Sequence, residues 1–229
     1  MNHALDAVDA VVMPTIMSTD RPTAVAEAIE YRRAFGSKLS HLMLPVTAVE
    51  LRSVQDHVAA VAESSGYRIT LQDYPRPTGV HVDVEVLCAA LTSIDVVDAV
   101  KEEAPEHTER IRRLSDAGIP TIGGLGGARA EHDLAAGACG LAAGISVPQV
   151  LAAALDAWER GASAADAIAP ALELIAFETS TSQSVGIRKE HWRRQGIIPN
   201  AVVRRAGAGW STDLETRTSS LLAPWLTDS

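Results

Sequence analysis

The stretch IDVVDAVK, residues Ile94–Lys101, joins an apolar run to a lysine and decides how the rest of the chain is interpreted. The run Ile94–Val100 is rich in valine, which predicts a buried strand of a parallel sheet. Lys101 follows directly, at a place where an amine is partly desolvated and its neutral form is favoured. A neutral lysine can attack a ketone and form a Schiff base, which then acts as an electron sink. Lys101 is therefore the candidate catalytic residue.

A plainer interpretation of Lys101 needs no chemistry. Its side chain can extend from the strand end into solvent, or form an ion pair with Glu102 or Glu103. For an isolated lysine at a strand end, this would be the usual outcome. Whether Lys101 is catalytic depends on the residues around it.

Strand and helix patterns alternate along the first two thirds of the chain. Short apolar runs bounded by Gly, Pro or Asp predict parallel strands, and longer amphipathic segments between them predict helices. This alternation predicts an α/β fold and is compatible with both a doubly wound sheet and a (β/α)8 barrel. The predicted strands are Asp9–Ile16, His41–Pro45, Tyr67–Gln72, Ile94–Val100, Ile119–Ile122 and Gly140–Ala143. The predicted helices among them are Pro22–Ala34 with Thr23 as a candidate cap, Ala48–Ser64, Asp83–Leu91, Pro105–Ala117 and Ala130–Ala136.

After residue 146 the strand signals stop. The remaining segments have helical spacing, which predicts a barrel portion over 1–146 and a C-terminal helical subdomain over 147–229. We expect this subdomain to pack on the α/β part or on a neighbouring subunit. The predicted helices are Val147–Arg160, Ser163–Glu178, Gly186–Arg194 and Asp213–Trp225.

Composition excludes several classes of partner. Acidic residues outnumber basic ones by 29 to 20, and the net charge of −9 argues against nucleic acid or an anionic membrane as a partner. The isolated Cys88 and Cys139 fit a reducing cytoplasm. The first residues have neither the basic region nor the long apolar run of a signal peptide, and no apolar run approaches the length of a membrane helix.

Metal and nucleotide cofactors have little support. The histidines form no HxH or HExxH pair and the cysteines no CxxC, so a metal site is not expected. The loop GGLGG, Gly123–Gly127, lacks the GxGxxG spacing of a dinucleotide fingerprint. We expect its glycines to let a substrate approach the backbone.

Three stretches, taken in order, resemble the family of dihydrodipicolinate synthase and N-acetylneuraminate lyase. VDAVKEEAPEHTERIRRL (Val97–Leu114) resembles the strand that carries the Schiff-base lysine. LQDYPRPTGVHVDVEVLCAAL (Leu71–Leu91) resembles the fifth strand and the turn after it. IGGLGGARAEHDLAAGACGLAAGI (Ile122–Ile145) resembles the seventh and eighth strands. A helical tail that includes FETSTSQSVGIRKEHWRRQGII (Phe177–Ile198) completes the resemblance.

The resemblance implies a TIM-type (β/α)8 barrel and a lyase or aldol-type synthase. It would act on pyruvate or a related 2-oxo acid through Lys101, without a cofactor. The family places a proton-relaying tyrosine on the fifth strand, but alignment on Pro75 puts Gln72 there. Gln72 can hold a carbonyl group but cannot act as an acid or base. Tyr74, two residues on, would share its face if the strand continues.

The pocket would be completed by backbone at two further strand ends, Gly124 and Ala142. This implies Lys101 and Tyr74 as catalytic residues, with Gln72, Gly124 and Ala142 binding the substrate.

The chain also departs from the family at its front. The Gly-Thr-Thr-Gly-Glu turn that binds the substrate carboxylate in the family does not occur in this sequence. Asp9–Ile16 aligns best with the third strand, which predicts that the first two βα units are absent. Unpaired strand edges would then favour self-association, and we expect a homo-oligomer. The same departures favour a second hypothesis, a non-catalytic relative that keeps the fold but has lost carboxylate binding and proton relay.

Overall fold

A computed structural model describes residues 12–180 and 182–226. The chain forms two compact units. The first contains the described residues up to Gly123 together with Asp133–Gly140, and the second contains Gly124–His132 and the described residues from Leu141 onward. Helix α7 (Ala130–Ala135) crosses the boundary between them.

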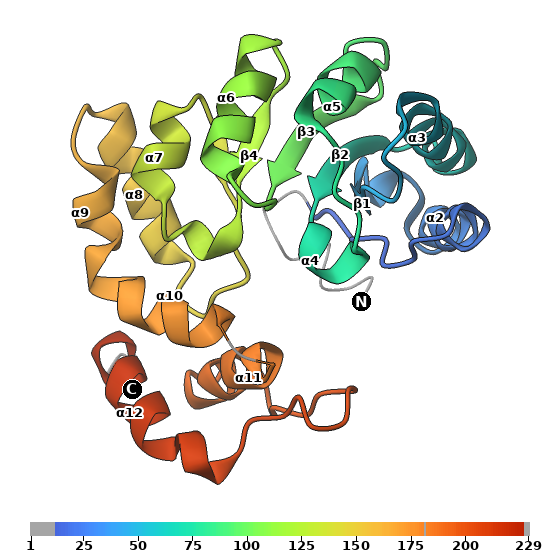
Figure 1. The fold of residues 1–229 in the computed structure, drawn as a ribbon. Helices are drawn as coiled ribbons and strands as arrows, with labels where there is room; N and C mark the ends of the chain where they lie inside the picture. Colours follow the sequence, from blue (N-terminus) through green and yellow to red (C-terminus); the bar gives the residue numbers. More distant parts are fainter. Residues whose placement is uncertain (1–11, 181, 227–229) are drawn as a thin grey trace. The chain divides into compact units, whose positions relative to one another are not determined.

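The first unit is built on a parallel sheet with strand order β1-β2-β3-β4-β5 (Figure 1). Each strand pairs with the next along the chain, which is the arrangement that successive βα units give. The strands are β1 (His41–Pro45), β2 (Arg68–Asp73), β3 (Val97–Glu102), β4 (Thr121–Gly123) and β5 (Gly140–Leu141). The expected parallel sheet is thereby confirmed.

The segment before β1 also joins the sheet. Thr15 forms a parallel bridge with Met43 of β1, supported by a hydrogen bond of 2.9 Å from the Ile16 amide to the Met43 carbonyl. Of the predicted strand Asp9–Ile16, residues 9–11 lie outside the described residues. From Val12 onward the prediction holds only for this bridge.

Helices cover one face of the sheet. They are α2 (Arg21–Phe35), α3 (Leu51–Ser65), α5 (Val84–Leu91) and α6 (His107–Asp116), with the single turn α4 (Pro75–Thr78) after β2. Figure 1 shows α2, α3, α5 and α6 side by side in chain order, on the outer side of the successive strands. The core between helices and sheet takes alternate strand residues, and all of the following are buried: Leu42, Leu44, Ile69, Leu71, Val100, Val54, Val58, Val61 and Leu87.

Local chemistry sets the helix ends. The Asp20 carboxylate accepts a hydrogen bond of 2.9 Å from the Thr23 amide, so Asp20 rather than Thr23 caps α2. The prediction of Thr23 as the cap was wrong. The helix begins at Arg21, one residue before the predicted start, so Thr23 lies inside its first turn. α3 ends at Gly66, whose φ of 68° is left-handed and whose amide bonds to the Ala62 carbonyl.

Strand β3 also differs from its prediction. The apolar run suggested Ile94–Val100, but the strand runs from Val97 to Glu102. A bulge in the β2 pairing accompanies its start, and pairing with both neighbours continues beyond the last apolar residue. Lys101 therefore lies within the strand and not after it.

The second unit is helical apart from its share of β5. One predicted helix, Ser163–Glu178, is divided near Pro170, which has no amide hydrogen and blocks the preceding turn. The elements are η2 (Leu125–Gly127), α8 (Gln149–Glu159), α9 (Ala164–Ile168), η3 (Ala169–Ala171), α10 (Leu172–Thr179), α11 (Ser184–Arg194), η4 (Thr212–Leu214), α12 (Glu215–Leu222) and η5 (Ala223–Trp225).

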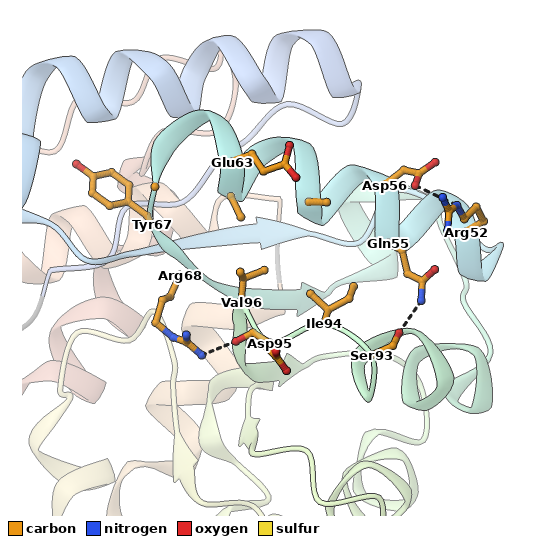
Figure 2. Close-up of a pocket in the computed structure, with 13 residues that line it drawn as sticks. Arg52, Gln55, Asp56, Glu63, Tyr67, Arg68, Ser93, Ile94, Asp95 and Val96 are labelled. Carbon is orange, nitrogen blue, oxygen red and sulfur yellow. Dashed lines mark hydrogen bonds and ion pairs between the residues drawn. The ribbon is translucent and has the colours of Figure 1, made fainter.

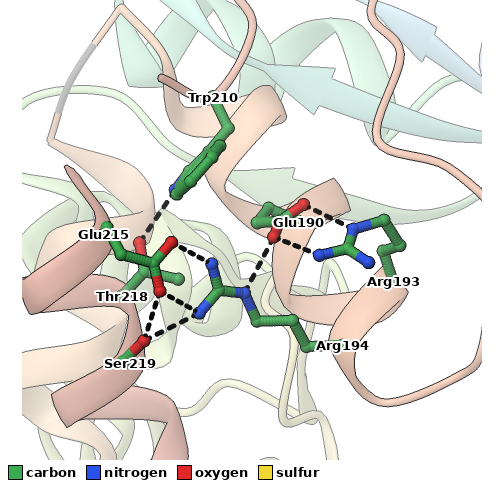
Figure 3. A network of polar contacts seen from close by, with 7 residues as sticks. All are labelled: Glu190, Arg193, Arg194, Trp210, Glu215, Thr218 and Ser219. Atoms are coloured by element: carbon green, nitrogen blue, oxygen red, sulfur yellow. Dashed lines mark hydrogen bonds and ion pairs between the residues drawn. The ribbon is translucent and has the colours of Figure 1, made fainter. Parts of the chain in front are cut away.

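A polar network joins α11 to α12 (Figure 3). The Arg194 guanidinium binds Glu190 at 2.8 Å and Glu215 at 2.6 Å, and it lies over the Trp210 ring. Hydrogen bonds from Arg194 and Ser219 lower the pKa of Glu215 to about 2. Arg194 thus stabilises the contact between these two helices.

Buried polar groups connect the start of the second unit's helical part to α10 and α11. The Ser146 amide donates a hydrogen bond of 2.8 Å to Glu178 of α10, and His191 of α11 contacts the same carboxylate. Because all three residues are buried, these bonds satisfy groups that water does not reach.

Candidate active site

Lys101 lies near the carboxyl end of β3, between two paired neighbours. Its Cα partners are Gln72 on β2 and Ile122 on β4. Paired residues in a sheet direct their side chains to the same face, so Lys101 and Gln72 share one. That face is opposite the helices, because the alternate residues Leu71 and Val100 belong to the helix-covered core.

Glu103 brings the two polar side chains of this face together. Lys101 Nζ lies 3.3 Å from Glu103 Oε2, and Gln72 Nε2 donates a hydrogen bond of 2.5 Å to the same oxygen. The Lys101 and Glu103 side chains are 13% and 10% exposed. The lysine is therefore mostly covered and lies beside a carboxylate. Of the plainer alternatives for Lys101, the ion pair with Glu103 is present.

The neighbouring Glu102 points the other way. It is fully buried, and Arg110 of α6 binds it at 3.1 Å while also pairing with the buried Asp73. Burial, reinforced by the Asp73 carboxylate, raises the pKa of Glu102 to about 8, and burial also raises the pKa of Asp73. One guanidinium thus faces two carboxylates, an arrangement that favours a shared proton.

Tyr74 does not continue the strand. β2 ends at Asp73, and Tyr74 precedes the turn α4 with φ −134° and ψ 72°. The simple alternation that would put Tyr74 on the face of Gln72 therefore stops one residue before it. Tyr74 remains at the carboxyl end of the same strand and is half-buried.

Gly124 and Ala142 each directly follow the last residue of a strand, because β4 ends one residue later and β5 two residues earlier than predicted. Gly124 comes after β4 and Ala142 after β5, and both belong to the second unit. Their role in lining a substrate pocket stays a prediction.

Packing and backbone conformation explain the glycine at position 127 in this loop. Gly127 has φ 73°, and a Cβ added there would lie 2.4 Å from Leu151. The left-handed φ and the nearby Leu151 methyl group of α8 both favour glycine at this position, whether or not a substrate approaches the loop.

The first unit also has a groove away from Lys101. A groove of about 830 Å³ is lined by α3 and by the segments that lead into β2 and β3 (Figure 2). Its polar side chains bind one another, with Gln55 Nε2 donating to Ser93 Oγ at 2.7 Å and Arg52 lying 3.3 Å from Asp56. Because Arg68 begins β2, this groove lies at the amino ends of the strands. Barrel enzymes react at the carboxyl ends, so it is not the candidate active site.

Over residues 12–180 and 182–226, no group of three His, Cys, Asp or Glu residues could hold a metal ion. No helix in those ranges is long and apolar enough to cross a membrane.

Comparison with known proteins identifies the fold. No protein-family model matches the sequence, and no curated protein matches it either. Solved structures do match. Dihydrodipicolinate synthase from Bacillus anthracis is 16% identical with a TM-score of 0.78, over 97% of this chain and 77% of that one. The same enzyme from Rhodopseudomonas palustris is 17% identical with a TM-score of 0.69, over 91% and 84%.

A sialic acid aldolase from Ruminococcus gnavus extends the likeness to the second enzyme of the group. It is 11% identical with a TM-score of 0.72, over 96% of this chain and 77% of that one. At such identities the likeness shows the fold. This chain has the TIM-barrel type of fold found in dihydrodipicolinate synthase and sialic acid aldolase, which confirms the fold class expected from the sequence.

Sequence reasoning missed the organising role of Glu103 and the part played by Arg110. Glu103 was considered only as an ion-pair partner of Lys101. Arg110 gave a weak signal, because it lies on a helix whose spacing turns Ile111 and Leu114 toward the core. An arginine next to such a face, after two strands that end in Asp73 and Glu102, could have suggested the buried cluster.

Proposed function

We propose that this chain is a Schiff-base-forming lyase or aldol-type synthase that acts on pyruvate or a related 2-oxo acid through Lys101. The observation that carries the proposal is the position of Lys101 on β3, mostly covered and 3.3 Å from a carboxylate. A nearby base can take the ammonium proton and leave the amine free to react. The fold supports the same conclusion, because barrel enzymes place their catalytic residues at the carboxyl ends of strands.

The proposed reaction begins when the Lys101 amine attacks the C2 carbonyl carbon of the 2-oxo acid. The resulting carbinolamine loses water and becomes an iminium ion. Loss of a C3 proton then gives an enamine, which can attack an electrophile or, in reverse, arise by cleavage of a carbon–carbon bond. Gln72 and Tyr74 would orient the carbonyl oxygen or the departing water, and backbone at Gly124 and Ala142 would line the pocket.

We further propose that the chain works as a homo-oligomer in the cytoplasm. Its free Cys88 and Cys139 support a reducing compartment. Sedimentation of the purified chain tests the oligomer, and a single monomeric species would contradict it.

A non-catalytic role is the second candidate. It is favoured by Gln72, which occupies the position where the resemblance implies a tyrosine. It is also favoured by the ion pair between Lys101 and Glu103, which could be purely structural. In that case Lys101 would never react with a 2-oxo acid.

Trapping with borohydride separates the two candidates. Borohydride reduces an iminium ion to a stable secondary amine, so wild type treated with pyruvate and borohydride should gain one covalent adduct. The sequence contains only three lysines, Lys38, Lys101 and Lys189, so peptide mass spectrometry can assign the adduct without ambiguity. We expect it on Lys101, with complete loss in Lys101→Ala.

Lys38→Ala and Lys189→Ala are the matched controls, and both should retain the adduct. An adduct that survives in Lys101→Ala would remove Lys101 from the mechanism. If no adduct forms with pyruvate or other short 2-oxo acids, the non-catalytic role would stand.

A further inference from the structure

The Glu103 carboxylate is the polar group that connects Lys101 to Gln72, and the proposed reaction uses it only as a base beside the ammonium group. We propose that Glu103 is the catalytic proton carrier of the Lys101 site, in place of the tyrosine that Gln72 replaces. This inference rests on the proposed function. It adds the residue that would move protons to and from the amine and C3 of the substrate.

Glu103 lies within reach of the amine that would react. Glu103 Oε2 lies 3.3 Å from Lys101 Nζ, so an atom bonded to that nitrogen would come within reach of the same carboxylate. Gln72 Nε2 holds this oxygen at 2.5 Å, and the Glu103 amide bonds to the Asp73 carbonyl at 2.9 Å. The carboxylate is thus held from both its side chain and its backbone, as a group that must meet a reacting atom requires.

Glu103 also has the acid–base chemistry that Gln72 lacks. A glutamine side chain cannot exchange protons, but a carboxylate accepts one and a carboxylic acid returns it. Gln72 can instead bind and orient Glu103, which is the contact observed. Gln72 would therefore position the reacting groups and Glu103 would transfer the proton, two roles that one tyrosine fills in the family.

The neighbouring Glu102 carboxylate does not share the position of Glu103. Glu102 is one residue away but lies on the opposite face of β3, fully buried against Arg110. It cannot reach a substrate on Lys101 without leaving that ion pair. Glu103 is 10% exposed and faces the lysine. Of these two neighbouring acids, only Glu103 has access to the amine.

We propose that Glu103 acts at three steps of the reaction. Glu103 accepts a proton from the Lys101 ammonium, and the neutral amine adds to C2 of pyruvate. A proton then passes from the added nitrogen to the oxygen and gives the neutral carbinolamine. The proton held by Glu103 is donated to the carbinolamine hydroxyl, which leaves as water and gives the iminium ion. Glu103, again a carboxylate, removes a proton from C3, and the C–H electron pair forms the C2–C3 double bond while the iminium electrons return to nitrogen.

This last step can be measured without knowing the second substrate. In D2O, reversal of enamine formation places deuterium on the methyl group of pyruvate, and proton NMR follows the loss of the methyl signal. We expect wild type to catalyse this exchange and Glu103→Gln to slow it by about 100-fold or more, as loss of an acid–base group does. Glu103→Asp keeps a carboxylate on a shorter arm and should recover part of the rate.

Glu102→Gln is the matched control. It makes the same substitution one residue away, on the opposite face of the strand, and should leave the exchange rate unchanged. Thermal melting of each variant shows whether it is folded. Borohydride trapping after long incubation with pyruvate should still label Lys101 in Glu103→Gln, because imine formation is slowed but not abolished.

The two assays distinguish the failure of this inference from the failure of the proposed function. If wild type gives neither adduct nor exchange, the Schiff-base function is wrong and this inference with it. If wild type gives both, and folded Glu103→Gln exchanges at the wild-type rate, only the role of Glu103 is wrong. An adduct without exchange in wild type would likewise exclude Glu103 as a base at C3.

Discussion

The two ends of strand β2 differ in what they offer a ligand. At its amino end, Arg68 borders the groove of about 830 Å³ shown in Figure 2. At its carboxyl end, Gln72 and Asp73 are buried, and each belongs to a different carboxylate cluster. The amino end borders a large groove, whereas at the carboxyl end polar side chains contact one another.

The volume of a groove is therefore not enough to identify a catalytic site. In the groove, Arg52 is 83% exposed and its pair with Asp56 is the type of surface ion pair that contributes little. At the carboxyl end, Lys101, Glu103, Glu102 and Arg110 are mostly or fully covered. Charges that are kept from water interact strongly, which both stabilises a structure and perturbs reactivity.

The largest expected effect is on stability at the carboxyl end. Arg110→Met should lower the free energy of unfolding by about 3–5 kcal/mol, because it leaves Asp73 and Glu102 buried without their cation. Chemical denaturation measures the loss. The matched change Arg52→Met in the groove should cost less than about 1 kcal/mol. Equal losses at the two sites would contradict the contrast drawn between the two ends.

The next effect is a pH dependence that comes from Glu102. Its pKa is about 8 in the folded chain because of burial, whereas an unfolded glutamate has a pKa of 4.5. Between these values the folded state holds a proton that the unfolded state has lost, so stability should fall as pH rises from about 5 to 8. The slope should approach but not exceed about 1.4 kcal/mol per pH unit.

Glu102→Gln mimics the protonated form and should flatten this part of the profile. Denaturation at several pH values in wild type and variant measures the slopes. A wild-type stability that rises through the same window, or an unchanged slope in the variant, would show that Glu102 is ionised in the folded chain.

Two tyrosines provide the third test, because they flank the same strand. Tyr74 is a second candidate for proton transfer at the carboxyl end, beside Glu103. If it takes part, Tyr74→Phe should slow pyruvate methyl exchange by about 100-fold without preventing the Lys101 adduct. Tyr67→Phe at the amino end removes the hydroxyl that donates to the Gly36 carbonyl at 2.5 Å. It should cost about 1 kcal/mol of stability and leave exchange unchanged. An exchange rate within twofold of wild type in Tyr74→Phe would exclude Tyr74.

Sequence patterns predicted the strands best where apolar residues define the whole strand. His41–Pro45 was predicted with its observed bounds, because the run is apolar and ends at proline. The end of β3 was missed because Lys101 and Glu102 are charged, and only pairing with β2 and β4 shows that the strand continues. Pairing is a property of the neighbouring strands and cannot be predicted from one strand's composition.

The candidate site was predicted in part for a related reason. A shared face for Gln72 and Lys101 follows from alternation along two paired strands. Glu103 lies one residue beyond β3, where alternation no longer fixes side-chain direction. Its contact with Lys101 depends on the turn that follows and on the Gln72 amide. The same limit applies to Tyr74, which lies one residue beyond β2.

The register that pairs Gln72 with Lys101 also bears on how such a site can change over evolution. Backbone hydrogen bonds between the strands hold the two Cα positions opposite each other, whichever side chains they carry. A replacement at position 72 can therefore exchange one chemical group for another while the nucleophile stays in place. A barrel of this kind can acquire a new reaction through single substitutions at positions paired with its lysine, and the Gln72–Glu103 contact would be one such solution.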